Sequence, residues 1–183
     1  DDCLEYTFQL EEGVKFHNGE VMTADDVVYS FEQYLANPAK NNFVSMIDKV
    51  EMVDANTVKV TLNKITPLFL VYINELPILN KKFVEEHNGN ISDVACGTGP
   101  YKFVRWDKDE AVVMERNEDY RLAPAAIEKV ELRYVGDRST ASVQLETGDL
   151  DIMSIDPSQL VSFENNDKFT VEKVQTLQTA LLA

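Results

Sequence analysis

The sequence predicts a mixed α/β fold, built from β-hairpins, a mixed sheet and several helices. Apolar residues alternate with polar ones over many short segments, and elsewhere they recur every three or four residues. The later part also has β-α-β order, because residues 127–155 read as a strand, a helix and a second strand. With 183 residues, 44% of them hydrophobic, the chain can bury a sizeable core in one compact unit.

The first segment is expected to form a strand that reverses at a tight turn. Tyr6 and Phe8 alternate with polar residues, which places them on one face of the strand. The alternation continues to Asn18-Gly19, a dipeptide that accepts the positive φ angles of a tight turn. The chain should therefore reverse at this point.

A helix is expected after this turn. Thr23 is a suitable N-cap, and Asp25 and Asp26 fall in the first turn, where the helix dipole favours negative charge. Asn37-Pro38 should end the helix. One face carries an apolar stripe that should pack on a core, formed by Val27, Val28, Phe31, Tyr34 and Leu35.

The next elements are a hairpin and two helices. Residues 49–53 and 57–62 read as paired strands around a turn at 54–56. Thr66-Pro67 resembles a helix start, and the following run, 68–73, is apolar on nearly all sides, so this helix should be deeply buried. Residues 81–87 should form a short polar helix.

The remaining elements follow a stiff corner at residues 97–100. Residues 101–106 and 111–116 should pair as a hairpin, and residues 127–135 should form another strand. A helix over 139–147, closed by Gly148, should precede a strand over 150–155. A short helix is expected at 157–163 and a strand at 169–174.

Charge and cysteine content exclude some classes of function. Asp and Glu number 32 against 17 Lys and Arg, so the formal net charge is −15 and nucleic acid is not an expected partner. There is no apolar run of the length that a membrane span needs. Cys3 and Cys96 lack the spacing of a zinc or redox site. They would be free thiols, or a disulfide if the protein is exported.

Candidate catalytic groups are few. His17 lies at the expected turn, where a loop-bonded imidazole is commoner than a catalytic one. Glu146, Asp149 and Asp151 form an acidic cluster around a helix end, where solvated carboxylates are commoner than metal ligands. A hydrolase that acts on a sugar or ester through Asp149 and Asp151 remains as an alternative to a binding protein.

Several segments together resemble the solute-binding proteins of oligopeptide, dipeptide and nickel-type ABC importers (family 5). The match lies in the residue types, order and separation of Tyr6–Gly19, Thr23–Ser30, Gly97–Phe103, Arg116–Arg121 and Gly148–Ile152. The resemblance runs over most of the chain, and the joint match is far more specific than any one of the motifs.

The resemblance implies a lobe of a two-lobed, periplasmic-binding-protein-like fold of type II. The chain would be a single partial lobe I: residues 1–96 would mainly form its extra subdomain and residues 97–183 mainly its core α/β part, with the second lobe absent. The expected ligand is a peptide or similar polar solute, held without cofactor or catalysis. The expected partners are ABC permease subunits with their ATPase, at the bacterial periplasm or the outer cell surface, with membrane contact through a lipid anchor or the permease.

The same resemblance suggests where solute contacts lie. In some members, the segment after the first helix and the segment after the buried helix contribute to the pocket. Matching positions here are Lys40, Phe43, Ile78 and Leu79. Nickel-chelate members resemble one another in having arginine and tryptophan at such places. This sequence has Lys40, Phe43 and Ile78 there instead, which argues against a metal-chelate ligand. A sensory or chaperone-like receptor on the same scaffold is a further alternative.

Overall fold

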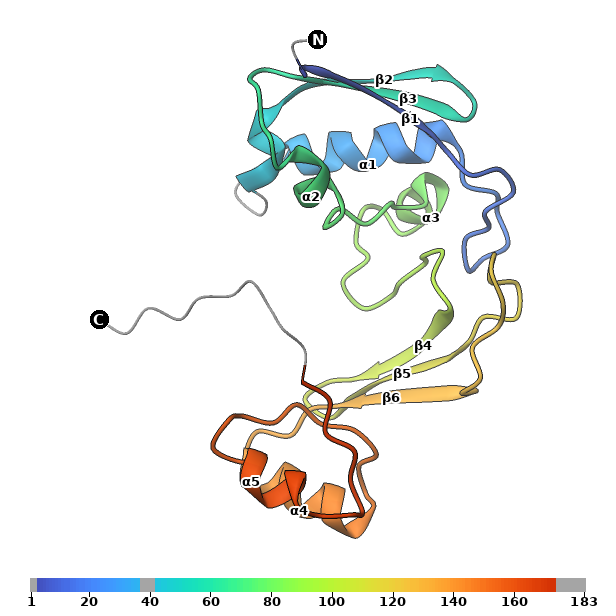
Figure 1. Ribbon diagram of the computed structural model, residues 1–183. Helices are drawn as coiled ribbons and strands as arrows, with labels where there is room; N and C mark the ends of the chain where they lie inside the picture. Colours follow the sequence, from blue (N-terminus) through green and yellow to red (C-terminus); the bar gives the residue numbers. More distant parts are fainter. Residues whose placement is uncertain (1–2, 37–41, 174–183) are drawn as a thin grey trace. The chain divides into compact units, whose positions relative to one another are not determined.

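The computed structural model describes residues 3–36 and 42–173 (Figure 1). The chain divides into two compact units, unit 1 up to Tyr134 and unit 2 from Val135 onward. Within these described residues, unit 1 contains two three-stranded sheets and unit 2 contains two helices. No helix in the described ranges is both long and apolar enough to cross a bilayer.

The first sheet of unit 1 is antiparallel, with strand order β1-β3-β2. Its strands are β1 (Glu5–Gln9), β2 (Ile47–Asp54) and β3 (Thr57–Leu62). In the central strand, Val58 and Val60 are fully buried, and they pair with Phe8 and Tyr6 of β1. This confirms the expected alternation of β1 and the expected hairpin of β2 and β3.

Helices cover one face of this sheet (Figure 1). They are α1 (Ala24–Ala36), the 3₁₀ helix η2 (Asn42–Met46), α2 (Phe69–Ile73) and α3 (Lys81–Glu86). The expected apolar stripe of α1 packs on the sheet, since Val27 and Phe31 are buried in the same core as Val58 and Val60. The predicted helix terminator Asn37-Pro38 lies outside the described residues.

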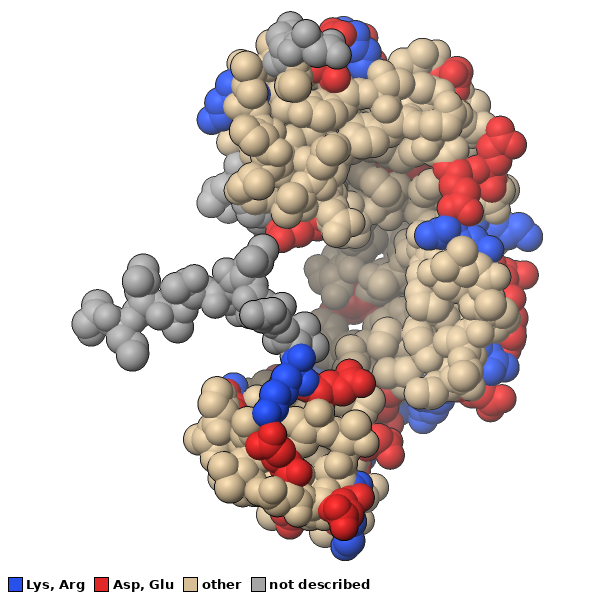
Figure 2. All heavy atoms as spheres, viewed as in Figure 1, with Lys and Arg blue, Asp and Glu red and all other residues tan. Residues whose placement is uncertain are grey.

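The predicted deep burial of the 68–73 helix is wrong. α2 has five residues, and only Phe69 is buried, while Leu70 and Val71 are 56% and 60% exposed. The Phe69 ring lies 4.7 Å from that of Tyr6. A single helical turn offers one face to the sheet, so its other apolar side chains remain at the surface. The area around α2 carries few charged side chains in the view of Figure 2.

The second sheet of unit 1 is also antiparallel, with strand order β4-β5-β6. Its strands are β4 (Tyr101–Asp107), β5 (Ala111–Arg116) and β6 (Lys129–Arg133). Trp106, Val112 and Leu132 lie opposite one another across the three strands. The expected hairpin over 101–116 is therefore confirmed, and the strand expected at 127–135 is present in shorter form.

Unit 2 contains α4 (Arg138–Thr147) and α5 (Leu160–Glu164). The Asp137 carboxylate accepts the backbone N–H of Thr140, which caps α4 at its start and lowers the pKa of Asp137. Gly148, with φ of +84°, closes α4 as expected.

The strands predicted after α4 are not formed in the part of the chain that the structure describes. Residues 150–155 and 169–173 have no strand pairing. The N–H groups of Asp149 and Leu150 both bond back to the carbonyl of Gln144 and close the helix instead. Alternating apolar residues need a neighbouring strand before they form a ladder, and no described strand provides one here. The expected β-α-β order is therefore wrong over this range.

The turn between β1 and α1 depends on glycine. Gly19 has φ of +89°, and its N–H donates to the carbonyl of Phe16 at 2.8 Å. We expect Gly19→Ala to lower the free energy of unfolding by about 1–2 kcal/mol, because a Cβ disfavours this backbone conformation. Gly99→Ala is the matched control: neither site crowds an added Cβ, but Gly99 does not have a positive φ. Equal losses in urea titrations of the two variants would contradict this explanation.

Candidate ligand-binding site

The segment after α2, residues 76–80, carries two of the predicted solute contacts and is anchored on α1. The backbone N–H of Leu79 donates to Ser30 Oγ at 2.8 Å. The Ser30 hydroxyl in turn donates to the carbonyl of Asp26 at 2.6 Å. Nearby, the Tyr34 hydroxyl donates to the carbonyl of Pro77 at 2.6 Å, and burial raises the pKa of this phenol.

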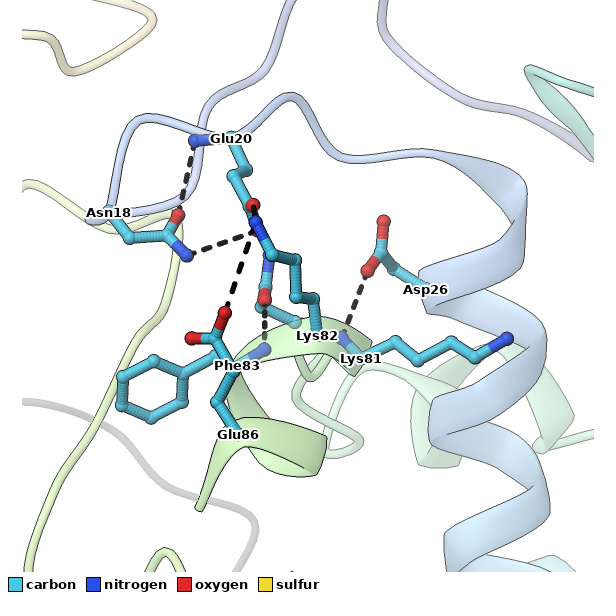
Figure 3. A network of polar contacts seen from close by, with 8 residues as sticks. Asn18, Glu20, Asp26, Lys81, Lys82, Phe83 and Glu86 are labelled. Carbon is cyan, nitrogen blue, oxygen red and sulfur yellow. Dashed lines mark hydrogen bonds and ion pairs between the residues drawn. The ribbon is translucent and has the colours of Figure 1, made fainter. Parts of the chain in front are cut away.

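A buried carboxylate fixes the end of the same segment. Asp26 Oδ1 accepts the backbone N–H of Lys81 at 3.0 Å, while its Oδ2 accepts the backbone N–H and the hydroxyl of Thr23 at 2.9 and 3.0 Å. Figure 3 shows Asp26 on α1 facing the backbone of Lys81 at the start of α3. One side chain therefore caps α1 and holds α3 at the same time.

A second polar network joins α3 to the turn before α1 (Figure 3). Asn80 caps α3 by accepting the N–H of Phe83 at 2.6 Å, and it donates to Glu20 Oε2 at 3.0 Å. Lys82 Nζ lies 2.5 Å from Glu20 Oε1. The Lys82 ammonium, followed by the Asn80 amide, lowers the pKa of the Glu20 carboxyl. These contacts give the segment before α3 a defined position.

An open groove of about 690 Å³ lies beside this segment. Most of its walls are apolar side chains from β1, β3, α1, α2 and the segments next to them, with Gln9, Glu11 and Asn74 as polar exceptions. Ile78 lines the groove and also packs against the core. The apolar walls suit an uncharged group better than a charged one, because burial of a charge without a partner is unfavourable.

The structure brings the predicted contact residues together only in part. Ile78 and Leu79 are consecutive, and both are half-buried. The backbone of Phe43 lies in η2, which contacts α2, but its side chain is outside the described part of the chain. Lys40 lies outside the described residues altogether.

Three of the motifs that are separate in the sequence meet at one place in unit 1. The His17 ring contacts Gly99 O at 3.0 Å through Nε2 and the N–H of Gly97 at 3.2 Å through Nδ1. Asn117, which is 1% exposed, donates to the same Gly99 carbonyl at 3.0 Å. This confirms a loop-bonded imidazole, and it gives the motifs a structural role.

The candidate acidic cluster lies around the C-terminal end of α4. Asp149 accepts the Thr147 hydroxyl at 3.0 Å, which places it at the end of α4. Among the described residues, no group of three or more His, Cys, Asp or Glu is placed to hold a metal ion. Cys3 and Cys96 are free thiols, and burial raises the pKa of Cys96.

Comparison with known proteins decides the family. The family model described as bacterial extracellular solute-binding proteins, family 5, middle region, matches residues 1–183. The chain belongs to this family. The resemblance drawn from the sequence motifs is confirmed, and the family is one of solute-binding proteins and not of enzymes.

Individual members of family 5 support the same assignment. The glutathione-binding protein GsiB of Pectobacterium atrosepticum is 32% identical over 181 residues, which cover 93% of this chain and 34% of GsiB. The structure of NikZ from Campylobacter jejuni in complex with Ni(L-His) has a TM-score of 0.82 and 34% identity, covering 91% of this chain and 35% of NikZ.

A third relative is the periplasmic binding protein DppA from Helicobacter pylori in complex with the peptide STSA. Its TM-score is 0.75 and its identity 29%, over 91% of this chain and 38% of DppA. The chain therefore spans about a third of the length of these three relatives. The predicted α/β binding-protein fold is confirmed, but both sheets in the described residues are antiparallel and not mixed.

Asp26, Ser30 and Asn80 position the segment at 76–80, and Asn117 positions the corner at Gly99; all four residues are buried. The sequence pattern marks Asp26 only as a first-turn charge, and Ser30 and Asn117 only as members of the family motifs. For Asp26 and Ser30 a signal was present. They are four residues apart, and Ser30 is three after Val27, so helical spacing puts polar groups on the buried face of α1. Asn80 also carried a signal, because Asn is a favoured N-cap residue and directly precedes the helix expected at 81–87. Asn117 carried no comparable signal.

Proposed function

We propose that this family 5 chain is part of the solute-capturing receptor of an ABC importer and that its ligand is an oligopeptide, a dipeptide or a similar polar solute. The observation that carries the proposal is the family match over residues 1–183. The solved relatives NikZ and DppA, one bound to Ni(L-His) and the other to a peptide, add support. No step in this function makes or breaks a covalent bond.

The chain would supply part of the first lobe. Residues 1–96 would mainly form the extra subdomain and residues 97–183 mainly the core α/β part. A boundary near 96 is supported by the sheets of unit 1, because the first is complete by Leu62 and the second begins at Tyr101.

The mechanism would be closure of two lobes around the solute. A solute that touches both lobes stabilises the closed form by contacts that the open form lacks. Backbone groups and ion pairs to the peptide termini would hold the constant parts of a peptide, while water-filled pockets accept different side chains. ABC permease subunits and their ATPase would act on the closed form, in the periplasm or at the outer surface of the cell.

Within this chain, Lys40, Phe43, Ile78 and Leu79 are the proposed solute contacts. The anchoring of Leu79 by Ser30 supports a preorganised segment, since a fixed backbone loses little entropy when a ligand binds. The contact between η2 and α2 supports a shared location for the two segments.

The test uses the natural protein that carries this sequence. Native mass spectrometry identifies the solute that co-purifies with it. We expect a peptide or small polar molecule that raises the melting temperature on re-addition, with no product formed. At a concentration one hundred times Kd, the stabilisation should be about 2.7 kcal/mol. Conversion of the solute to a product would support the hydrolase alternative, and no stabilisation by any peptide or polar solute would contradict the proposal.

A variant pair tests the proposed contacts in the same protein. Lys40→Ala should weaken solute binding about tenfold, the loss expected from one ion pair or hydrogen bond to a charged group. Lys49→Ala is the matched control, because Lys49 is exposed and pairs with Glu51 on β2. Equal dissociation constants for both variants and the natural protein would remove Lys40 from the site.

A further inference from the structure

The contacts of His17 select one protonation form of its ring. An amide N–H can only donate and a carbonyl oxygen can only accept a hydrogen bond. The N–H of Gly97 points at Nδ1 from 3.2 Å, so this nitrogen must be unprotonated. The carbonyl of Gly99 is 3.0 Å from Nε2, so that nitrogen must carry the proton. Only the neutral ring, protonated at Nε2, satisfies both contacts.

These contacts are part of a joint between three segments of unit 1, which we define as His17, Gly97, Gly99 and Asn117. The backbone N–H of His17 also donates to the carbonyl of Gly97 at 2.8 Å. Asn117 donates its side-chain amide to Gly99 O and its backbone N–H to the carbonyl of Pro100. The joint thereby ties the turn before α1 to the start of β4 and the end of β5.

We propose that His17 makes this joint proton-sensitive, so that acidification loosens the connection between the turn and the second sheet. A second proton on the ring must bind at Nδ1, where it faces the N–H of Gly97. The hydrogen bond is lost, and two donors then oppose each other in a half-buried site.

The charged groups on the surrounding segments include three ion-paired carboxylates: Glu20 with Lys82, Glu11 with Arg121 and Glu118 with Arg116. Lys15 and Asp119 on these segments are exposed, and the Cys96 thiol adjoins the corner. The group that Nδ1 itself contacts is the N–H of Gly97.

The second histidine of the chain has the opposite arrangement. His87 Nδ1 lies 2.7 Å from the carbonyl of Phe83, so this nitrogen carries a proton and donates. A further proton at Nε2 leaves that hydrogen bond intact. Because the chain has two histidines, His87 is a matched internal control for His17.

Thermal unfolding at pH 8 and pH 5.5 tests the proposal, since imidazoles change charge in this range. A second proton on the His17 ring removes the hydrogen bond from the Gly97 N–H, so stability should fall as the pH falls. We expect the melting temperature of the natural protein and of His87→Asn to fall by about 2–4 °C more than that of His17→Asn, as for loss of one hydrogen bond. An equal fall in all three proteins would overturn the proposal.

Ring ¹⁵N spectra keep the proposal testable if His17→Asn does not fold. At pH 8, His17 should be protonated at Nε2 and His87 at Nδ1. The amide proton resonance of Gly97 should move between pH 8 and pH 5.5, because its acceptor is His17 Nδ1. Protonation of His17 at Nδ1 at pH 8 would overturn the proposal, and so would a Gly97 amide resonance that does not shift between pH 8 and pH 5.5.

Discussion

Phe69→Ala is expected to lower the free energy of unfolding by about 3–5 kcal/mol, the usual loss for a large aromatic residue removed from a core. Phe69 is 2% exposed, and its ring lies against those of Tyr6 and Phe8, with centroids 4.7 and 6.4 Å away. The deletion leaves a cavity between α2 and β1 that one helical turn cannot fill. Urea denaturation of the variant and the natural protein measures the loss.

Neighbouring positions of α2 provide the control. Leu70 and Val71 are more than half exposed, so Leu70→Ala and Val71→Ala should change the free energy of unfolding by about 0.5 kcal/mol or less. A deeply buried helix, as the sequence alone predicts, would instead give losses of several kcal/mol at all three positions. The three variants therefore distinguish a deeply buried α2 from a helix that is buried only at Phe69.

Asp26→Ala should lower the free energy of unfolding by about 3 kcal/mol. The Asp26 carboxylate accepts three hydrogen bonds, two from Thr23 and one from the backbone of Lys81. Hydrogen bonds to charged groups each contribute about 1.5–3 kcal/mol, and donors left unpaired in a buried place destabilise further. The free energy of unfolding of Asp26→Asn should lie between those of Asp26→Ala and the natural protein, because the asparagine amide keeps one acceptor oxygen. Guanidinium titrations of the three proteins give the comparison.

The adjacent residue is the matched control for this series. Asp25 is exposed and forms an ion pair with Lys81 Nζ at 2.8 Å, and surface pairs of this kind contribute little. Asp25→Ala should therefore leave the unfolding midpoint nearly unchanged. A comparable loss at Asp25 and Asp26 would mean that helix-dipole charge, and not the tertiary hydrogen bonds of Asp26, is what matters at this end of α1.

Several local elements, and the family, can be predicted from the amino-acid sequence alone. Alternation in β1, the turn at Asn18-Gly19, the apolar stripe of α1 and the closure of α4 by Gly148 depend on residues close together in the chain. The same holds for the family motifs, whose residue types and order are read directly from the sequence. Such features are predictable because their physical causes act over a few residues.

Tertiary contacts set which apolar faces are covered and which partners the buried polar groups have. The run 68–73 is apolar along most of its length, but only Phe69 of α2 is buried against the sheet. The partner of Asp26 is 55 residues away at Lys81, and Gly99 is 82 residues from His17. Residues 150–155 alternate but form no strand, because no described neighbour completes a ladder. Burial and pairing are properties of distant segments brought together, so short-range sequence patterns do not specify them.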